Sequence, residues 1–134
     1  MAIILDGDIG VTAADVAATT LSINAGYGSN AAAYGCRAWV NFNGTGTVAI
    51  RDSANVSSIT DNSVGNYTVN FTTAMPDANY SISATANLNV SGNYGTYISG
   101  PVTQAPTASA WRFFANTYSG TVQDPLYATI NFFR

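Results

Sequence analysis

The stretch that decides the fold is residues 80–88, Tyr80-Ser81-Ile82-Ser83-Ala84-Thr85-Ala86-Asn87-Leu88. Apolar and polar side chains alternate along it at every step, as in a β-strand that buries one face and exposes the other. An amphipathic helix would repeat its apolar residues every three or four positions instead. We therefore expect a strand here, in a sheet that covers a core on one side.

Four further stretches repeat this period of two. Their expected inward residues are Ala38, Val40 and Phe42; Val48 and Ile50; Tyr67, Val69 and Phe71; and Leu126, Ala128, Ile130 and Phe132. Residues 110–118 are apolar on both faces and predict a strand buried on two sides. Turn-forming sequences separate the stretches, at 43–46, 61–65, 76–77, 91–93, 119–120 and 124–125. Together they predict an all-β protein, an antiparallel β-sandwich or barrel of the jelly-roll-like kind.

The composition of the chain changes near residue 36. Residues 1–36 are rich in Ala, Gly and Asp and poor in large side chains after Leu5, whereas aromatic and β-branched residues recur in short runs from Arg37 onward. This change predicts an extended N-terminal arm, residues 1–36, followed by a β domain, residues 37–134.

Charged residues make up only 8% of the chain, with four Arg, seven Asp and no Lys, Glu or His, for a net charge of −3. The arginines are scattered along the sequence, so we expect no nucleic-acid partner. The single cysteine, Cys36, excludes an intrachain disulfide and a cysteine-based zinc site. The N-terminus has no basic region and no long apolar run, which predicts synthesis in a cytoplasm and no membrane insertion.

The sequence offers little for catalysis. Without histidine, a Ser–His–Asp or Cys–His arrangement is impossible. The carboxylates Asp52, Asp61, Asp77 and Asp124 lie in or beside predicted turns, where Asp is common because it bonds to nearby backbone. The alternative is a glycan depolymerase that uses two of these carboxylates. We predict no catalytic residue, no metal site and no cofactor.

The small number of charged residues also predicts whether copies of the chain associate. Natural proteins protect the exposed edges of their sheets with charged residues or Pro, and this chain has few of either. Identical subunits that cover these edges would solve the problem, which predicts an oligomer. A covering N-terminal arm is the competing explanation.

Aromatic residues supply the candidates for a binding surface. Trp39 and Trp111 are expected in the core or at an interface, where large rings are usually found. Tyr94 and Tyr97 flank Gly95 in a predicted loop, residues 91–100, and loops commonly carry binding residues. The candidate receptor contacts are Asn93, Tyr94, Tyr97 and Tyr118.

Residues 37–84 contain the most distinctive sequence. The segments Arg37–Arg51 (RAWVNFNGTGTVAIR), Asn55–Asn62 (NVSSITDN), Tyr67–Phe71 (YTVNF) and Met75–Tyr80 (MPDANY) follow one another. This block resembles a module of tailed-bacteriophage virion proteins, notably tail-fibre and related fibre-like proteins. The family usually has a glycine after Asp-Asn, where this chain has Ser63, with Gly65 following.

The resemblance implies a function and an assembly. It implies a homotrimeric fibre-type virion component with a β domain that points outward to contact a host-surface glycan or protein, and no catalytic residues. The start of the chain is similar to the N-termini of small phage fibre proteins, which implies that the arm, with Ile3, Ile4 and Leu5, attaches to other virion proteins. The alternative is a capsid decoration or head-fibre protein that stabilises the shell without binding a receptor.

Overall fold

The computed structural model describes residues 22–23, 31–32, 35–88, 96–101 and 103–134. The chain divides into two compact units, Met1–Ala33 and Tyr34–Arg134. In the first unit, β1 (Ser22–Ile23) pairs with β2 (Ala31–Ala32) in an antiparallel arrangement. The expected attachment residues Ile3, Ile4 and Leu5 lie outside the described residues.

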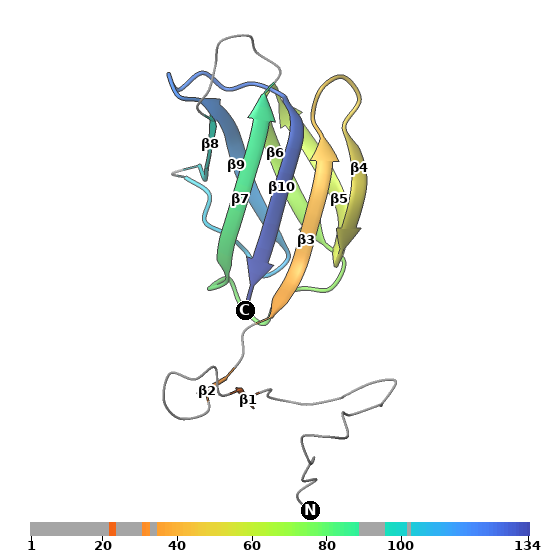
Figure 1. Cartoon of the computed structure of the whole chain (residues 1–134), viewed down its shortest axis with the longest axis vertical. Helices are drawn as coiled ribbons and strands as arrows, with labels where there is room; N and C mark the ends of the chain where they lie inside the picture. Colours follow the sequence, from red (N-terminus) through yellow and green to blue (C-terminus); the bar gives the residue numbers. More distant parts are fainter. Residues whose placement is uncertain (1–21, 24–30, 33–34, 89–95, 102) are drawn as a thin grey trace, which may run out of the picture. The chain divides into compact units, whose positions relative to one another are not determined.

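The second unit is a β-sandwich (Figure 1). Its strands are β3 (Cys36–Asn43), β4 (Ala49–Ala54), β5 (Val56–Ser63), β6 (Asn66–Phe71), β7 (Ser81–Leu88), β8 (Thr96–Ser99), β9 (Ala110–Thr117) and β10 (Pro125–Phe133). One sheet has the order β4-β3-β10-β7 and the other β5-β6-β9-β8, and every pairing is antiparallel. The prediction of an all-β antiparallel fold is confirmed, with two separate sheets rather than a closed barrel.

Tight connections explain how the chain passes between strands. Residues 44–48 close the β3–β4 hairpin, and Val64 and Gly65 close the β5–β6 hairpin. Between β4 and β5 the chain changes sheet at one residue, Asn55, which has a φ of 55°. Its side chain holds the crossing in place, because the amide donates to the Thr73 carbonyl at 3.0 Å and accepts from the Thr73 N–H at 2.8 Å.

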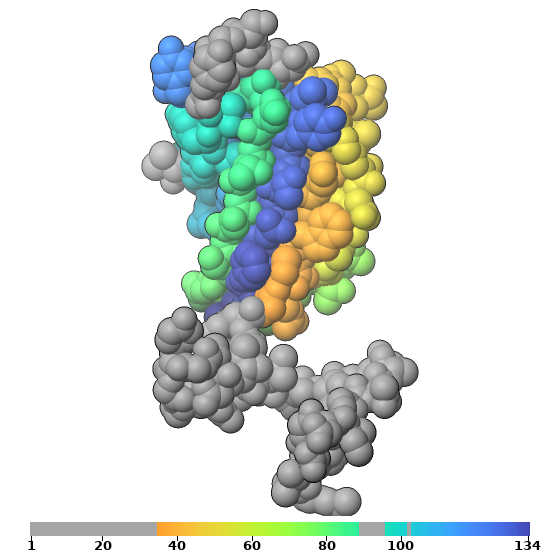
Figure 2. All heavy atoms as spheres, viewed as in Figure 1, coloured from red at the N-terminus to blue at the C-terminus, as the bar shows by residue number. Residues whose placement is uncertain are grey.

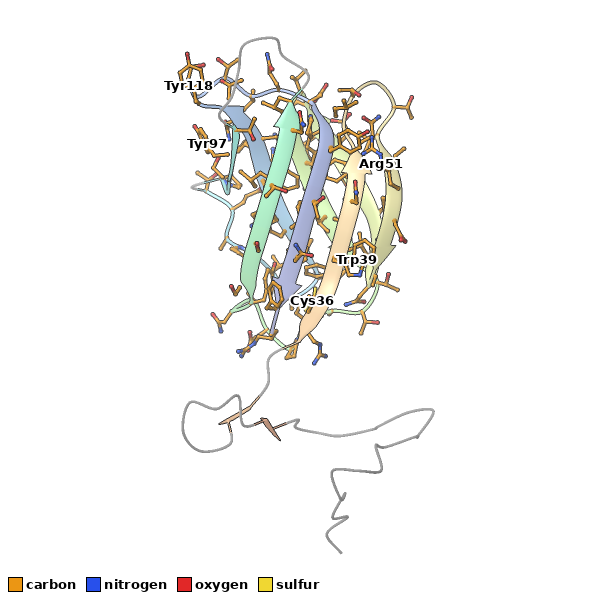
Figure 3. The ribbon with its side chains drawn as sticks, viewed as in Figure 1. Cys36, Trp39, Arg51, Tyr97 and Tyr118 are labelled. Atoms are coloured by element: carbon orange, nitrogen blue, oxygen red, sulfur yellow. The ribbon has the colours of Figure 1, made fainter. Side chains whose placement is uncertain are left out.

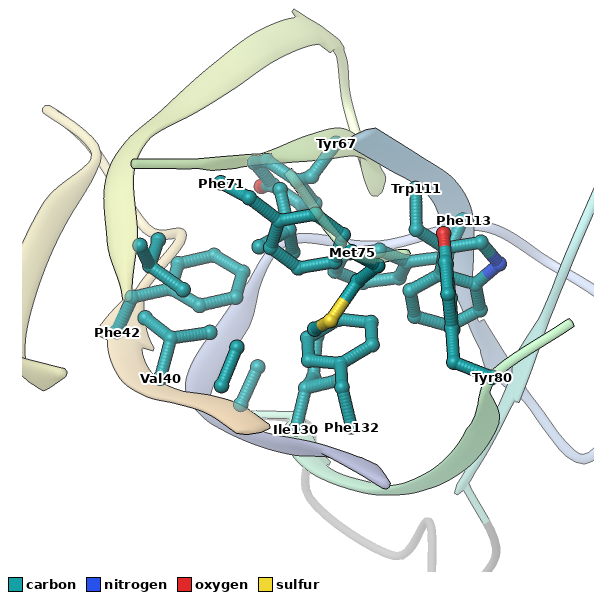
Figure 4. Packing of buried hydrophobic residues seen from close by; sticks show 14 residues of the cluster. Val40, Phe42, Tyr67, Phe71, Met75, Tyr80, Trp111, Phe113, Ile130 and Phe132 are labelled. Atoms are coloured by element: carbon teal, nitrogen blue, oxygen red, sulfur yellow. The ribbon is translucent and has the colours of Figure 1, made fainter. Parts of the chain in front are cut away.

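The core lies between the two sheets and is dominated by aromatic rings (Figure 4). Phe71 packs edge-on against Phe132, with ring centroids 4.8 Å apart, and Trp111 stacks on Phe113 at 5.0 Å. The inward residues expected from period two are buried in β3, β6 and most of β10. In β7 the same face holds Ile82, Ala84 and Ala86 half-buried and Leu88 buried, so the alternation that decided the fold is confirmed.

The structure corrects four expectations about single positions and segments. Trp39 is not in the core: it lies half-buried on the outer face of β3, between the buried Ala38 and Val40, and its place at an interface stays a prediction. Ile50 is paired with the buried Phe42, but it lies on β4, an edge strand of its sheet, and is 37% exposed. Tyr118 follows β9 and is 74% exposed, so the segment 110–118 is not buried on two sides throughout. Residues 61–63 continue β5 instead of forming the turn, which is confined to residues 64–65.

Candidate functional site

Two of the candidate carboxylates, Asp52 and Asp77, accept hydrogen bonds from nearby backbone N–H groups. Asp77 accepts a hydrogen bond from the Asn79 N–H at 2.8 Å and pairs with Arg134, whose guanidinium lowers the pKa of this carboxyl. Asp52 accepts from the N–H of the next residue, Ser53, at 2.8 Å. Asp61 is exposed on β5. The interpretation of Asp52 and Asp77 as backbone-bonding residues is therefore confirmed.

Asp124 joins three loops at one end of the sandwich. Its Oδ1 accepts hydrogen bonds from the Gly65 N–H at 2.7 Å and from the hydroxyl of Tyr67. The Tyr67 hydroxyl also lies 3.2 Å from the Gly44 carbonyl, and the Gly44 N–H donates to the Pro125 carbonyl at 2.7 Å. Burial raises the pKa of Tyr67 well above its usual value, and the hydrogen bond that its hydroxyl donates to Asp124 raises it further. This network holds both hairpin loops against the segment that leads into β10.

No group of three or more His, Cys, Asp or Glu side chains within the described residues could hold a metal ion. The part of the chain that the structure describes also has no helix long and apolar enough to cross a membrane.

Two of the four candidate receptor contacts lie together at the end of β8 and β9 (Figure 3). Tyr97 lies on β8 and not in the loop that was expected over residues 91–100. It is 46% exposed and is paired with Asn116 on β9, while Tyr118 comes two residues after Asn116. Val122, which is 37% exposed, bridges to Asn116 as well. We call Tyr97, Tyr118 and Val122 the tyrosine patch. The other two candidates, Asn93 and Tyr94, lie outside the described residues.

The outer face of the β4-β3-β10-β7 sheet carries a second exposed ring. In Figure 2, β7, β10 and β3 lie side by side and present this face to the viewer. Tyr127 on β10 is 47% exposed, and the guanidinium of Arg51 lies 4.1 Å above its ring. Arg51 also donates to the Leu126 carbonyl at 2.8 Å, so this cation is already engaged within the sheet.

The outer face of the other sheet contains a cleft of about 300 Å³. Its lining includes Asn62, Thr68, Gln104, Thr107, Ala110 and Arg112, and we call it the Arg112 cleft. β5 and β6 supply Asn62 and Thr68, β9 supplies Ala110 and Arg112, and the β8–β9 connection supplies the rest. Thr68 and Arg112 are paired across β6 and β9, which places both side chains on the face opposite the core.

No local pattern in the sequence predicts the Arg112 cleft. Arg112 was one of four scattered arginines, and Gln104 lay in a stretch without a clear pattern. One signal was present: Arg112 interrupts an otherwise apolar run between Trp111 and Phe113. Its neighbours across the sheet come from residues 62–68, about which the local sequence around Arg112 says nothing.

Comparisons with known proteins find similarity in the fold. No family model and no curated protein matches the sequence. Among solved structures, the chain is similar to the phiAB6 tailspike, which was solved in complex with three-repeated oligosaccharides of Acinetobacter baumannii surface polysaccharide, with a TM-score of 0.55 and 18% identity. The match covers 84% of this chain and 23% of the tailspike chain. At this identity the similarity concerns the fold, and the chain corresponds to less than a quarter of the tailspike.

Proposed function

We propose that this chain is a fibre-type virion protein of a tailed phage, and that its β-sandwich contacts the surface of the host cell. The observation that carries the proposal is the fold, which over 84% of the chain is similar to part of a tailspike solved with a surface oligosaccharide. The resemblance of residues 37–84 to a fibre-like virion module points the same way from the sequence. The protein would be synthesised in the host cytoplasm and assembled into the virion.

In this proposal the chain binds and does not catalyse. The hydrogen bonds of Asp52, Asp77 and Asp124 hold backbone or neighbouring side chains, which supports a structural role for these carboxylates. The proposed binding needs no cofactor. The tyrosine patch supplies exposed rings of the kind that stack on sugars or bury in a partner surface.

The proposed assembly is a homotrimer that joins other virion proteins through residues 1–36. Three copies of one weak site raise the overall affinity without any new contact, because the second and third sites bind at high effective concentration. Weak contacts from each sandwich would then suffice for attachment.

Binding of the labelled full-length protein to a panel of bacterial strains tests this function. We expect binding to a subset of strains, and loss of binding when Tyr97 and Tyr118 are both replaced by Ala. Tyr127→Ala is the matched control, because its ring is as exposed as that of Tyr97 but lies on the other sheet. Binding to none of the strains, together with binding to phage capsids, would favour the shell-stabilising alternative.

A further inference from the structure

We propose that the Arg112 cleft binds a carboxylate-bearing sugar unit of the host-surface glycan. The inference rests on the proposed function, because it identifies a second contact and the chemistry that the contact recognises. Four observations carry it: how Arg112 is held, what charge surrounds it, which donors it leaves open, and what else lines the cleft.

Two neutral amides hold the guanidinium of Arg112 in position. Its Nε donates to Asn66 Oδ1 at 2.9 Å, and its Nη1 donates to Gln104 Oε1 at 2.7 Å. Asn66 is only 5% exposed, so the residues packed around it hold one of these two amides in place. A cation that is ordered before its ligand arrives loses little conformational entropy on binding.

No carboxylate neutralises this cation. Among the described residues, the ion pair found is between Arg134 and Asp77, and no acidic residue lines the cleft. Arg51, by comparison, is stacked on Tyr127 and bonded to the Leu126 carbonyl. Within the described part of the chain, Arg112 therefore has no carboxylate partner at ion-pair distance.

The cleft presents more donors than acceptors. Arginine has five N–H groups, and Arg112 uses two of them, which leaves three without an acceptor among the described residues. The carbonyl oxygen of the Gln104 amide is the group bonded to Arg112, and its nitrogen likewise has no acceptor among the described residues. A carboxylate offers only acceptors and fits the guanidinium fork, so it matches this surplus.

The remaining lining suits a sugar. Asn62 and Thr68 supply an amide and a hydroxyl, joined by a hydrogen bond of 3.0 Å, and such neutral polar groups pair with ring hydroxyls. Ala110 contributes a small apolar surface against which the C–H groups of a sugar ring can lie. A single cation among neutral groups favours one acidic sugar over a highly charged phosphate ligand.

Gln104→Glu tests the proposal with a change of one atom. The new carboxylate would lie where the amide now meets Arg112, and would occupy the guanidinium from within the chain. Asn41→Asp is the matched control, since it places a carboxylate beside Arg51, 3.5 Å from its guanidinium, with the same change in net charge. Arg112→Gln is less informative, because it leaves the buried Asn66 carbonyl without its donor.

The probe is trigalacturonate, an oligosaccharide with a carboxylate on each sugar, titrated into the full-length protein and followed by ¹H–¹⁵N NMR. We expect millimolar binding with shifts centred on Thr68, Gln104 and Arg112. Affinity should fall by about tenfold or more in Gln104→Glu, as the loss of a charge-assisted contact predicts, and should stay unchanged in Asn41→Asp. The melting temperature of both variants should match that of the parent protein.

Three results would overturn the assignment: no shifts at millimolar probe, equal binding of the methyl-esterified trisaccharide, or equal displacement by inorganic phosphate. The cell-binding assay separates this proposal from the function on which it rests. If Gln104→Glu binds cells as the parent does, the cleft is not the glycan site and the attachment function stands. If the cleft binds trigalacturonate but the protein binds no cells, the attachment function fails, and only the recognition of a carboxylate-bearing sugar by the cleft stands.

Discussion

Two glycines in the hairpin turns show two separate reasons why a position requires glycine: a backbone with positive φ, and too little space for a Cβ atom. Gly46 and Gly65 both have positive φ, at 69° and 63°, where a Cβ atom is unfavourable. They differ in space: a Cβ on Gly46 would meet nothing within 4 Å, whereas one on Gly65 would lie 2.6 Å from the backbone nitrogen of Gln123. Gly65 thus meets a backbone requirement and a packing requirement at once.

Gly65→Ala should therefore destabilise the protein more than Gly46→Ala. We expect a cost of about 1–2 kcal/mol at Gly46, from the left-handed backbone alone. At Gly65 the clash with residue 123 adds about 1–3 kcal/mol. Denaturant unfolding of the two variants measures the difference, and equal costs would show that the close approach to Gln123 relaxes freely.

Tyr80 makes the stability sensitive to alkaline pH. Burial raises the pKa of Tyr80 to about 12, from about 10 in an unfolded chain. Between these values the folded state holds a proton that the unfolded state has lost, so the free energy of unfolding falls as the pH rises through this window. At lower pH the contribution of Tyr80 is complete.

Tyr80→Phe should flatten part of this alkaline fall. At neutral pH it should cost about 1 kcal/mol, because the Tyr80 hydroxyl lies within hydrogen-bond distance of the carbonyls of Thr107, at 3.1 Å, and Ala110, at 3.2 Å. Unfolding curves recorded across the alkaline range measure both effects. An unchanged pH dependence would mean that other groups, such as Tyr67, account for the fall.

At the level of the strand, a side chain's face decides its contribution. Trp111 on β9 is 8% exposed and packs against Phe113 and Phe132, whereas Trp39 on β3 lies on the outer face. The two tryptophans have the same chemistry but face different surroundings.

Trp111→Ala should cost about 3–5 kcal/mol, as expected for removal of a buried aromatic ring. Trp39→Ala should cost about 1 kcal/mol or less in the isolated chain, because it leaves no cavity in the core. Thermal unfolding of the two variants tests this ordering. If Trp39→Ala lowered the melting temperature as much as Trp111→Ala, an interface between copies would be the explanation to test next.

For the whole molecule, the edges of the sheets decide how copies associate. β7 is an eight-residue edge strand without charge or proline, the kind of edge that invites pairing with another chain. The Thr96 hydroxyl of β8 donates a hydrogen bond to the Ala86 carbonyl, so one backbone carbonyl of this strand already has a partner within the chain.

Light scattering of the purified protein measures its assembly. We expect a mass of three times 13.9 kDa that does not change on dilution. A stable monomer would contradict the trimer and the argument from unprotected edges.

The sequence alone determined the all-β fold class, the positions of most strands and most of the inward residues, because alternation with period two is a local property of the chain. It did not predict β5 and placed β8 in a loop. It also placed Tyr97 and Tyr118 among the candidates for the exposed surface. The order of strands in each sheet and the register bulge beside Ile50 depend on which strands become neighbours. Only the tertiary structure brings Asn62, Thr68, Gln104 and Arg112 around one cleft, because their proximity follows from strand pairing between distant segments and from no local pattern.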